Sequence, residues 1–127
     1  MARISDYFLR AAVLAGLIGM SMGMYMGINH DFSMAPAHAH LNLLGWASMA
    51  IYALFYRAFP HAAEGMLPRV HFMIALPALL IMVPGIAMIN LGYEAGEPVT
   101  GIGSILMIAG FLVFCVIVMK ATKPARA

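Results

Sequence analysis

Four long apolar runs separated by short polar stretches dominate the pattern of hydrophobic and polar positions along this chain. The runs cover roughly residues 7–28, 37–59, 70–91 and 99–119. Each is long enough to cross the roughly 30 Å hydrocarbon core of a bilayer as an α-helix. Little of the chain is left outside them. The pattern therefore predicts an all-α fold with one domain over residues 1–127, an integral membrane four-helix bundle.

The composition supports a lipid bilayer as the surroundings of these helices. The 127 residues are 64% hydrophobic and 9% charged, and their mean hydropathy is +0.93. A water-soluble domain of this size could not hide so much apolar surface. We therefore expect the bilayer to be the main partner of the chain.

The basic residues predict an orientation in the membrane. All seven lie at the chain start, in the loop after the second run, or at the chain end: Arg3, Arg10, Arg57, Arg69, Lys120, Lys123 and Arg126. The loops 29–36 and 92–98 carry none. Because basic loops stay in the cytoplasm, we expect both termini in the cytoplasm and a bacterial inner membrane location. The net charge of +2 thus reflects topology, and we expect no nucleic acid partner.

The first run combines a small-residue pattern with a series of methionines. Gly19, Gly23 and Gly27 recur every four residues, which lets another helix approach closely. Four methionines alternate along the same stretch, namely Met20, Met22, Met24 and Met26. Thioether sulfur suits Cu(I), but only methionines four residues apart share a helix face. Filling gaps beside the glycines is the alternative role for these side chains.

Two histidines, His38 and His40, stand at the start of the second run. Ionisable side chains are costly in a membrane and usually mark a site. At about 100° per residue the two rings face nearly opposite sides, so they suit two sites better than one metal ion. Asn42 follows His38 by four residues and could orient its ring. The helix start favours neutral imidazole, the ligand form. The alternative is a pair of interfacial histidines bonded to loop carbonyls.

Other polar side chains are assigned by their expected depth. His30 lies in the first outer loop and Asn90 near the outer end of the third run, at a depth similar to that of the histidine pair. His71 starts the third run at the opposite side, about 30 Å away, and we expect it at the interface. The lone Cys115 lies within the fourth run, where we expect it to act as a small apolar residue.

The outer side also gathers residue types that bind copper, without any positive charge. These residues are His30, Asp31, Met34, His38, His40, Glu94 and Glu97. Imidazole and thioether together favour copper among the common metals. A copper-binding membrane transport protein or metallochaperone is therefore one functional hypothesis.

Residues 37–46, Ala-His-Ala-His-Leu-Asn-Leu-Leu-Gly-Trp, with their continuation to Pro60, resemble one helix of the catalytic subunit of haem–copper oxidases and nitric oxide reductases. The likeness is strongest to the C-type cytochrome c oxidases. That helix carries a His-x-His pair, often followed by Leu-Gly-Trp. The resemblance covers about 25 residues. It implies that His38 and His40 bind haem iron, the first a high-spin and the second a low-spin haem, toward the outer side.

The same resemblance suggests an assembly and a function. The family's large subunit is a ring of three pseudo-repeated four-helix units, so a single unit is expected to form a homotrimer. We expect a protein that binds haem b for electron transfer or O2 or NO binding, an oxidoreductase if it turns over, with an unidentified redox partner. A non-covalent haem is implied because Cys-x-x-Cys-His is absent.

The chain departs from that family at two points. The three further histidines that hold copper in the large enzymes have no counterpart here, and no outer arginine is present to hold haem propionates. Propionates would then use backbone, water, His30 or Asn90. A third hypothesis is a non-catalytic assembly subunit whose histidines bind nothing.

Overall fold

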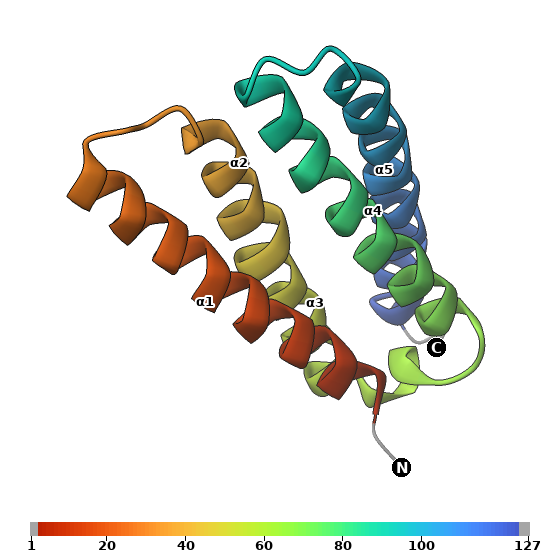
Figure 1. Cartoon of the computed structure of the whole chain (residues 1–127). Coiled ribbons are helices and arrows are strands. Elements are labelled where there is room, and N and C mark those ends of the chain that lie inside the picture. Colours follow the sequence, from red (N-terminus) through yellow and green to blue (C-terminus); the bar gives the residue numbers. More distant parts are fainter. Residues whose placement is uncertain (1–2, 125–127) are drawn as a thin grey trace.

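The computed structural model describes residues 3–124, which form helices joined by short turns (Figure 1). In chain order the elements are α1 (Ile4–Asn29), α2 (Ala35–His40), the π-helix η1 (Leu41–Ala47), α3 (Ser48–Ala58), the 3₁₀ turn η2 (Pro60–Ala63), α4 (Leu67–Asn90) and α5 (Gly96–Ala121). No strand occurs among the described residues. The predicted all-α fold is confirmed, and the four helical segments coincide with the four apolar runs.

Three of the helices, α1, α4 and α5, are long and apolar enough to cross a membrane. The second run is a continuous helical segment of α2, η1 and α3, interrupted only by the change of hydrogen-bond pattern in η1. Large apolar side chains face outward along the long helices, for example Leu17, Leu80 and Ile105, which are 61%, 62% and 70% exposed. Such a surface fits lipid or a protein partner rather than water.

The helices form two antiparallel hairpins that lie side by side (Figure 1). The first hairpin packs α1 against α2, η1 and α3, and the second packs α4 against α5. Helix α4 joins the hairpins through its contacts with α1, α2 and η1. An ion pair between Asp6 and Arg57 ties the start of α1 to the end of α3. His61 Nε2 lies 3.3 Å from the carbonyl of Ala121, so the end of α5 reaches the same end of the bundle. Arg126 lies outside the described residues.

Glycines set the distance between the helices in both hairpins. A Cβ added at Gly19 or Gly23 would lie 2.3 Å from Asn42 Oδ1 or 2.8 Å from His38 Cε1, so the predicted close approach at these two positions is confirmed. A Cβ added at Gly27 would meet no other part of the described chain within 4 Å, so the prediction was wrong there. In the second hairpin, Gly103 lies against the backbone of Met82, where a Cβ would be 2.7 Å from the Met82 Cα.

The tightest core lies at the end of the bundle where α1 begins and α3 ends. Phe8 is fully buried and packs on Tyr52 and Tyr56 of α3, with ring centroids 5.5 and 5.7 Å apart. Phe72 of α4 meets Phe8 edge-on at 4.9 Å. Phe114 of α5 completes the group at 4.6 Å from Tyr52. These rings form an aromatic cluster to which all three described long helices and α3 contribute.

Candidate functional site

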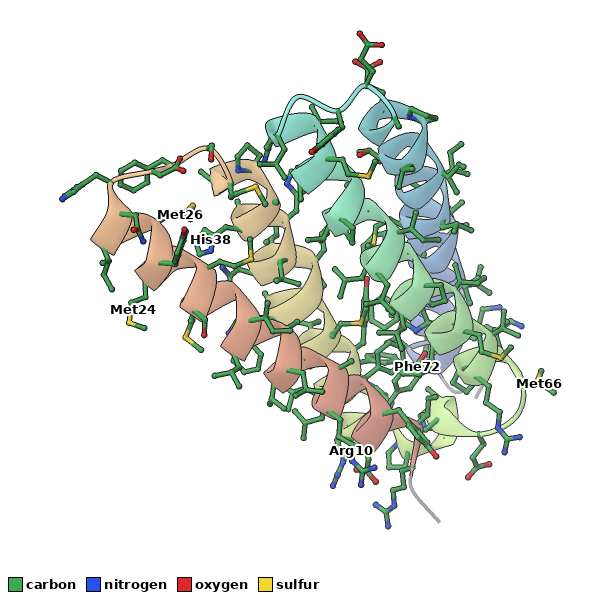
Figure 2. All side chains as sticks on the ribbon, in the orientation of Figure 1. Arg10, Met24, Met26, His38, Met66 and Phe72 are labelled. Carbon is green, nitrogen blue, oxygen red and sulfur yellow. The ribbon has the colours of Figure 1, made fainter. Side chains whose placement is uncertain are left out.

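His38 projects from α2 into the contact between α2 and α1 (Figure 2). Its Nδ1 lies 2.7 Å from the carbonyl oxygen of Gly19 in α1. The ring also covers Gly23, whose missing side chain leaves the space that the imidazole Cε1 fills. His38 is therefore fixed to the neighbouring helix by a hydrogen bond and by close packing on glycine.

His40 is held in a different way, although its ring nitrogen has the same kind of partner. Its Nδ1 lies 2.7 Å from the carbonyl oxygen of Pro36, one turn earlier in its own helix. A carbonyl can only accept a hydrogen bond, so Nδ1 carries the hydrogen in both His38 and His40. In the neutral imidazole Nε2 is then the unprotonated nitrogen. Metal-binding histidines commonly use this arrangement, with the remote N–H held by a carbonyl.

The surroundings of the two Nε2 atoms differ. In His38, Nε2 would lie 3.4 Å from a Cβ at Gly23, so this atom is close to the α1 backbone. His40 is half-buried, and within residues 3–124 its ring forms one hydrogen bond, to the Pro36 carbonyl. The Nε2 of His38 thus lies against α1, whereas the His40 ring has no hydrogen bond to another helix among the described residues. The alternative interpretation expected loop carbonyls to hold the two rings. The carbonyls that hold them, those of Gly19 and Pro36, belong to helices instead.

Asn42 lies beside His38 and packs on Gly19 of α1. Its Nδ2 donates to the carbonyl of His38 at 3.1 Å and lies 3.2 Å from His38 Nδ1. The ring is oriented mainly by Gly19, because the 2.7 Å contact to that carbonyl already uses the Nδ1 hydrogen. One turn further on, Trp46 packs on Gly16, where a Cβ would be 3.1 Å from its indole ring.

The π-helix η1 begins directly after the histidine pair, and sequence reasoning did not predict it. Its hydrogen bonds run from residue i to i+5, as in the bond from the Ser48 backbone N–H to the Leu43 carbonyl. In an α-helix, residues four apart drift by about 40° per step, whereas the wider π turn rotates less per residue. This difference lets His38, Asn42 and Trp46, spaced by four residues, all meet α1. Such π segments are frequent at functional sites.

The other predicted ligands lie apart from this contact. His30 ends α1 in the left-handed conformation, with a φ of 52°, and is exposed. Beside it, the backbone N–H and hydroxyl of Ser33 hold the pKa of Asp31 below its usual range. Asn90 is the last residue of α4, and its Nδ2 is buried without a partner among the described residues. Within residues 3–124, no three His, Cys, Asp or Glu side chains are grouped closely enough to hold a metal ion.

His71 lies in a different place from the one expected. We predicted an interfacial residue, but the side chain is fully buried in the aromatic cluster, with the Phe114 ring stacked at 5.3 Å. Its Nδ1 shares a hydrogen bond of 2.9 Å with the Tyr56 hydroxyl, while Nε2 is buried without a partner among the described residues. The prediction was wrong because depth along the helix says nothing about which face turns inward. The aromatic residues at the same depth were the available signal.

Two of the cavities formed by residues 3–124 lie outside the histidine contact. One, of about 600 Å³, is lined by Met22 and Met26 of α1 and by Met34 of the following loop. The expected pairing of Met22 with Met26 is therefore present, while Met20 and Met24 are 62% and 67% exposed on another face. The second cavity, of about 830 Å³, lies at the opposite end of the bundle and was not anticipated from the sequence.

Comparison with known proteins gives no further guidance. No protein-family model matches the sequence, and no similar protein was found among curated proteins or solved structures. The functional argument therefore rests on the chain itself.

Proposed function

We propose that this chain is a haem b protein of the bacterial inner membrane, in which His40 would hold the iron. The observation that carries the proposal is the tethered imidazole, in which the Pro36 carbonyl holds Nδ1 at 2.7 Å and leaves Nε2 for a metal. The likeness of residues 37–46 to a haem-binding helix points the same way. Bound haem would supply one-electron transfer or the binding of O2 or NO.

Within one copy of the chain, we assign only one of the two histidines, His40, to holding the iron. His38 faces α1 and is packed on Gly19 and Gly23, so we assign it to positioning the ligand helix. A second side chain that would hold the iron would then come from another copy of the chain. This requirement supports the proposed homotrimer, in which three four-helix units close into a ring. The unpartnered Nδ2 of Asn90 is the donor that we assign to a haem propionate.

The orientation is part of the proposal. Arg57 and Arg69 flank the turn between α3 and α4, and Arg3 and Lys120 lie at the same end of the bundle. The positive-inside rule then puts that end, with both termini, in the cytoplasm and the histidine pair toward the outer side.

Absorption spectra of the purified protein, oxidised and reduced with dithionite, test the haem assignment. We expect a Soret band and sharp reduced α and β bands in the wild-type protein, and loss of the low-spin spectrum in His40→Ala. His61→Ala is the matched control, because His61 lies at the other end of the bundle and is exposed. His71→Ala should also retain the haem spectrum wherever the protein still folds. Unchanged haem content in His40→Ala would contradict the assignment, and a monomer in native mass spectrometry would exclude the trimer.

The three methionines around one cavity favour copper binding, for transport or as a metallochaperone, as the second candidate function. Met22, Met26 and Met34 place three thioethers around the same space, and thioethers select Cu(I). Replacing Met22 and Met26 by Leu conserves volume and should weaken Cu(I) binding in competition with a coloured chelator. The Met20→Leu/Met24→Leu protein is the control, because these side chains lie outside the cavity. Equal Cu(I) affinity in both double variants would remove the copper hypothesis.

A further inference from the structure

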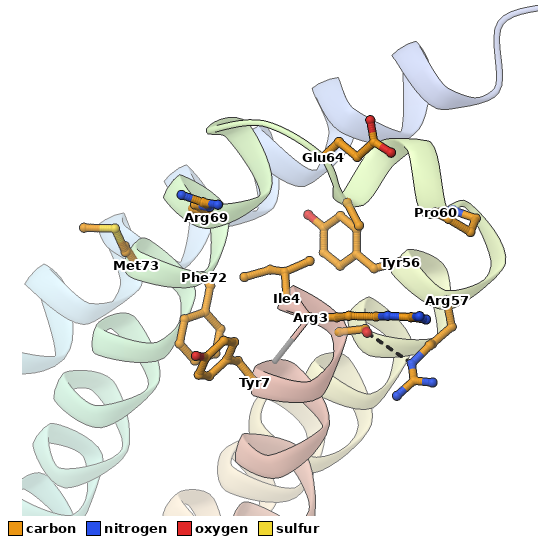
Figure 3. A pocket seen from close by; sticks show the side chains of 12 residues that line it. Arg3, Ile4, Tyr7, Tyr56, Arg57, Pro60, Glu64, Arg69, Phe72 and Met73 are labelled. Carbon is orange, nitrogen blue, oxygen red and sulfur yellow. Dashed lines mark hydrogen bonds between the residues drawn. The ribbon is translucent and has the colours of Figure 1, made fainter. Parts of the chain in front are cut away.

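The cavity of about 830 Å³ opens at the end of the bundle that carries the arginines (Figure 3). Its walls come from the start of α1, the end of α3, the turn η2 and the start of α4. Three arginines, Arg3, Arg57 and Arg69, line it, against a single acidic residue, Glu64. The lining thus carries an excess of positive charge.

The three arginines are not equally engaged within the protein. Arg57 forms an ion pair with Asp6 and donates from Nε to the Ser5 hydroxyl at 3.1 Å, which is the dashed line in Figure 3. Within residues 3–124, no carboxylate lies within 4 Å of the Arg3 or Arg69 guanidinium. Both side chains belong to exposed residues. Two guanidinium groups at the cavity are therefore available to an anion.

The remaining wall of the cavity is apolar and extends to the outside of the bundle. Tyr7 and Phe72 lie with ring centroids 5.8 Å apart, and Met73 follows on α4. Tyr7 is 45% exposed and Met73 is 69% exposed. The lining therefore passes from guanidinium groups to an apolar surface on helices long enough to span a membrane. A small soluble anion needs the first surface only, whereas a phospholipid uses both.

We propose that this cavity is a binding site for the phosphate headgroup of an anionic phospholipid. Arg3 and Arg69 contact the phosphate, and Tyr7, Phe72 and Met73 contact the upper part of the acyl chains. Basic pockets between membrane helices on the cytoplasmic side recognise such headgroups. Arginine suits the role because its planar fork binds phosphate through two parallel hydrogen bonds. The site does not depend on the haem, since its residues are separate from His38 and His40.

Lipid retention by the full chain tests the proposal. Protein is reconstituted in nanodiscs of phosphatidylcholine with or without phosphatidylglycerol, then released and examined by native mass spectrometry. We expect one tightly held phosphatidylglycerol per chain in the wild type. Arg3→Gln/Arg69→Gln should bind it roughly 30-fold more weakly, since two basic contacts at a membrane surface are lost. The control is Arg10→Gln/Lys120→Gln, two exposed basic residues that do not line the cavity.

A variant with the opposite effect separates binding from misfolding. Glu64→Gln removes the single carboxylate of the lining and should raise phosphatidylglycerol retention, a gain that a damaged fold would not produce. Equal retention in the wild type and in both double variants would overturn the site. Equal retention of phosphatidylcholine would overturn its selectivity for anionic lipid. Displacement of the lipid by millimolar inorganic phosphate or glycerol phosphate would assign the cavity to a soluble phosphate compound instead.

Discussion

The two hairpins use glycine for opposite purposes. In the first, Gly19 and Gly23 leave space that the side chains of Asn42 and His38 fill, so polar groups enter the contact between helices. In the second, Gly103 brings the backbone of α5 directly onto that of α4 at Met82. The contact at Gly19 and Gly23 can adjust, because the side chains that fill it can rotate. The contact at Gly103 cannot adjust in this way, because it joins two helix backbones. The candidate site lies in the hairpin whose contacts at Gly19 and Gly23 are made by side chains.

The largest expected effect comes from filling the backbone contact of the second hairpin. In Gly103→Ala the new Cβ would lie 2.7 Å from the N, Cα and Cβ atoms of Met82, so the two helices must separate. We expect a loss of about 3 kcal/mol in the free energy of unfolding, at the upper end for overpacked cores. Unfolding in mixed detergent and SDS micelles, followed by circular dichroism, measures it.

The same substitution in the first hairpin sharpens the comparison. Gly19→Ala should cost about 1 kcal/mol, because the Asn42 amide can move aside. Gly27→Ala should stabilise α1 by up to about 1 kcal/mol, since nothing lies within 4 Å and alanine favours the helix. An equal loss at Gly19 and Gly103 would show that the two contacts do not differ in this way.

An intermediate effect is expected where the hairpins are joined, at the hydrogen bond between Tyr56 and His71. In Tyr56→Phe both ring nitrogens of the buried histidine lack a partner, and we expect a loss of about 1–3 kcal/mol in the free energy of unfolding. Adding His71→Phe removes the orphaned polar atoms and should recover part of that loss. The same unfolding titrations measure this double-mutant cycle. Strictly additive losses would contradict a coupled pair.

The smallest effect concerns the loop that closes the first hairpin. The Ser33 N–H and hydroxyl lower the pKa of Asp31, so the ionised form stabilises the turn. This contribution is complete above the pKa of the unfolded chain, about 3.9, and is lost as the pH falls through the lower pKa of the folded state. The protection of residues 31–34 against amide exchange, relative to the intrinsic rate at each pH, should therefore fall only below about pH 4. In Asp31→Asn that pH dependence should be absent.

The helices were predictable from the sequence because the length of each apolar run alone indicates where a helix lies. The four runs mark the helices because a bilayer-spanning helix needs about 20 apolar residues. Gly19 and Gly23 were found because spacing by four places small residues on one face. Gly27 follows the same spacing, yet a Cβ there would contact no neighbouring helix within 4 Å. Trp46 packs on Gly16 instead. A search limited to glycines spaced by four misses this contact.

The candidate site was predictable in its residues but not in its geometry. The pair His38 and His40 stands out in an apolar run, and their separation on the helix follows from its pitch. The carbonyl partners in Gly19 and Pro36 depend on how helices pack, which sequence does not state. The π segment was missed because i→i+5 bonding has no compositional signature. The arginine cavity was missed because it unites segments far apart in the chain.

The π-helix η1 also determines how the second helical segment would respond to the deletion of one residue. Losing one codon within residues 41–47 would exchange i→i+5 bonds for i→i+4 bonds. Because the α turn rotates more per residue than the π turn, this exchange would absorb the loss and leave α2 at nearly the same angle to α3. The aromatic cluster lies on the far side of η1 and would stay in place. The same loss within α3, which has no π turn to absorb it, would instead rotate His38 and His40 by about 100° relative to the end of that helix.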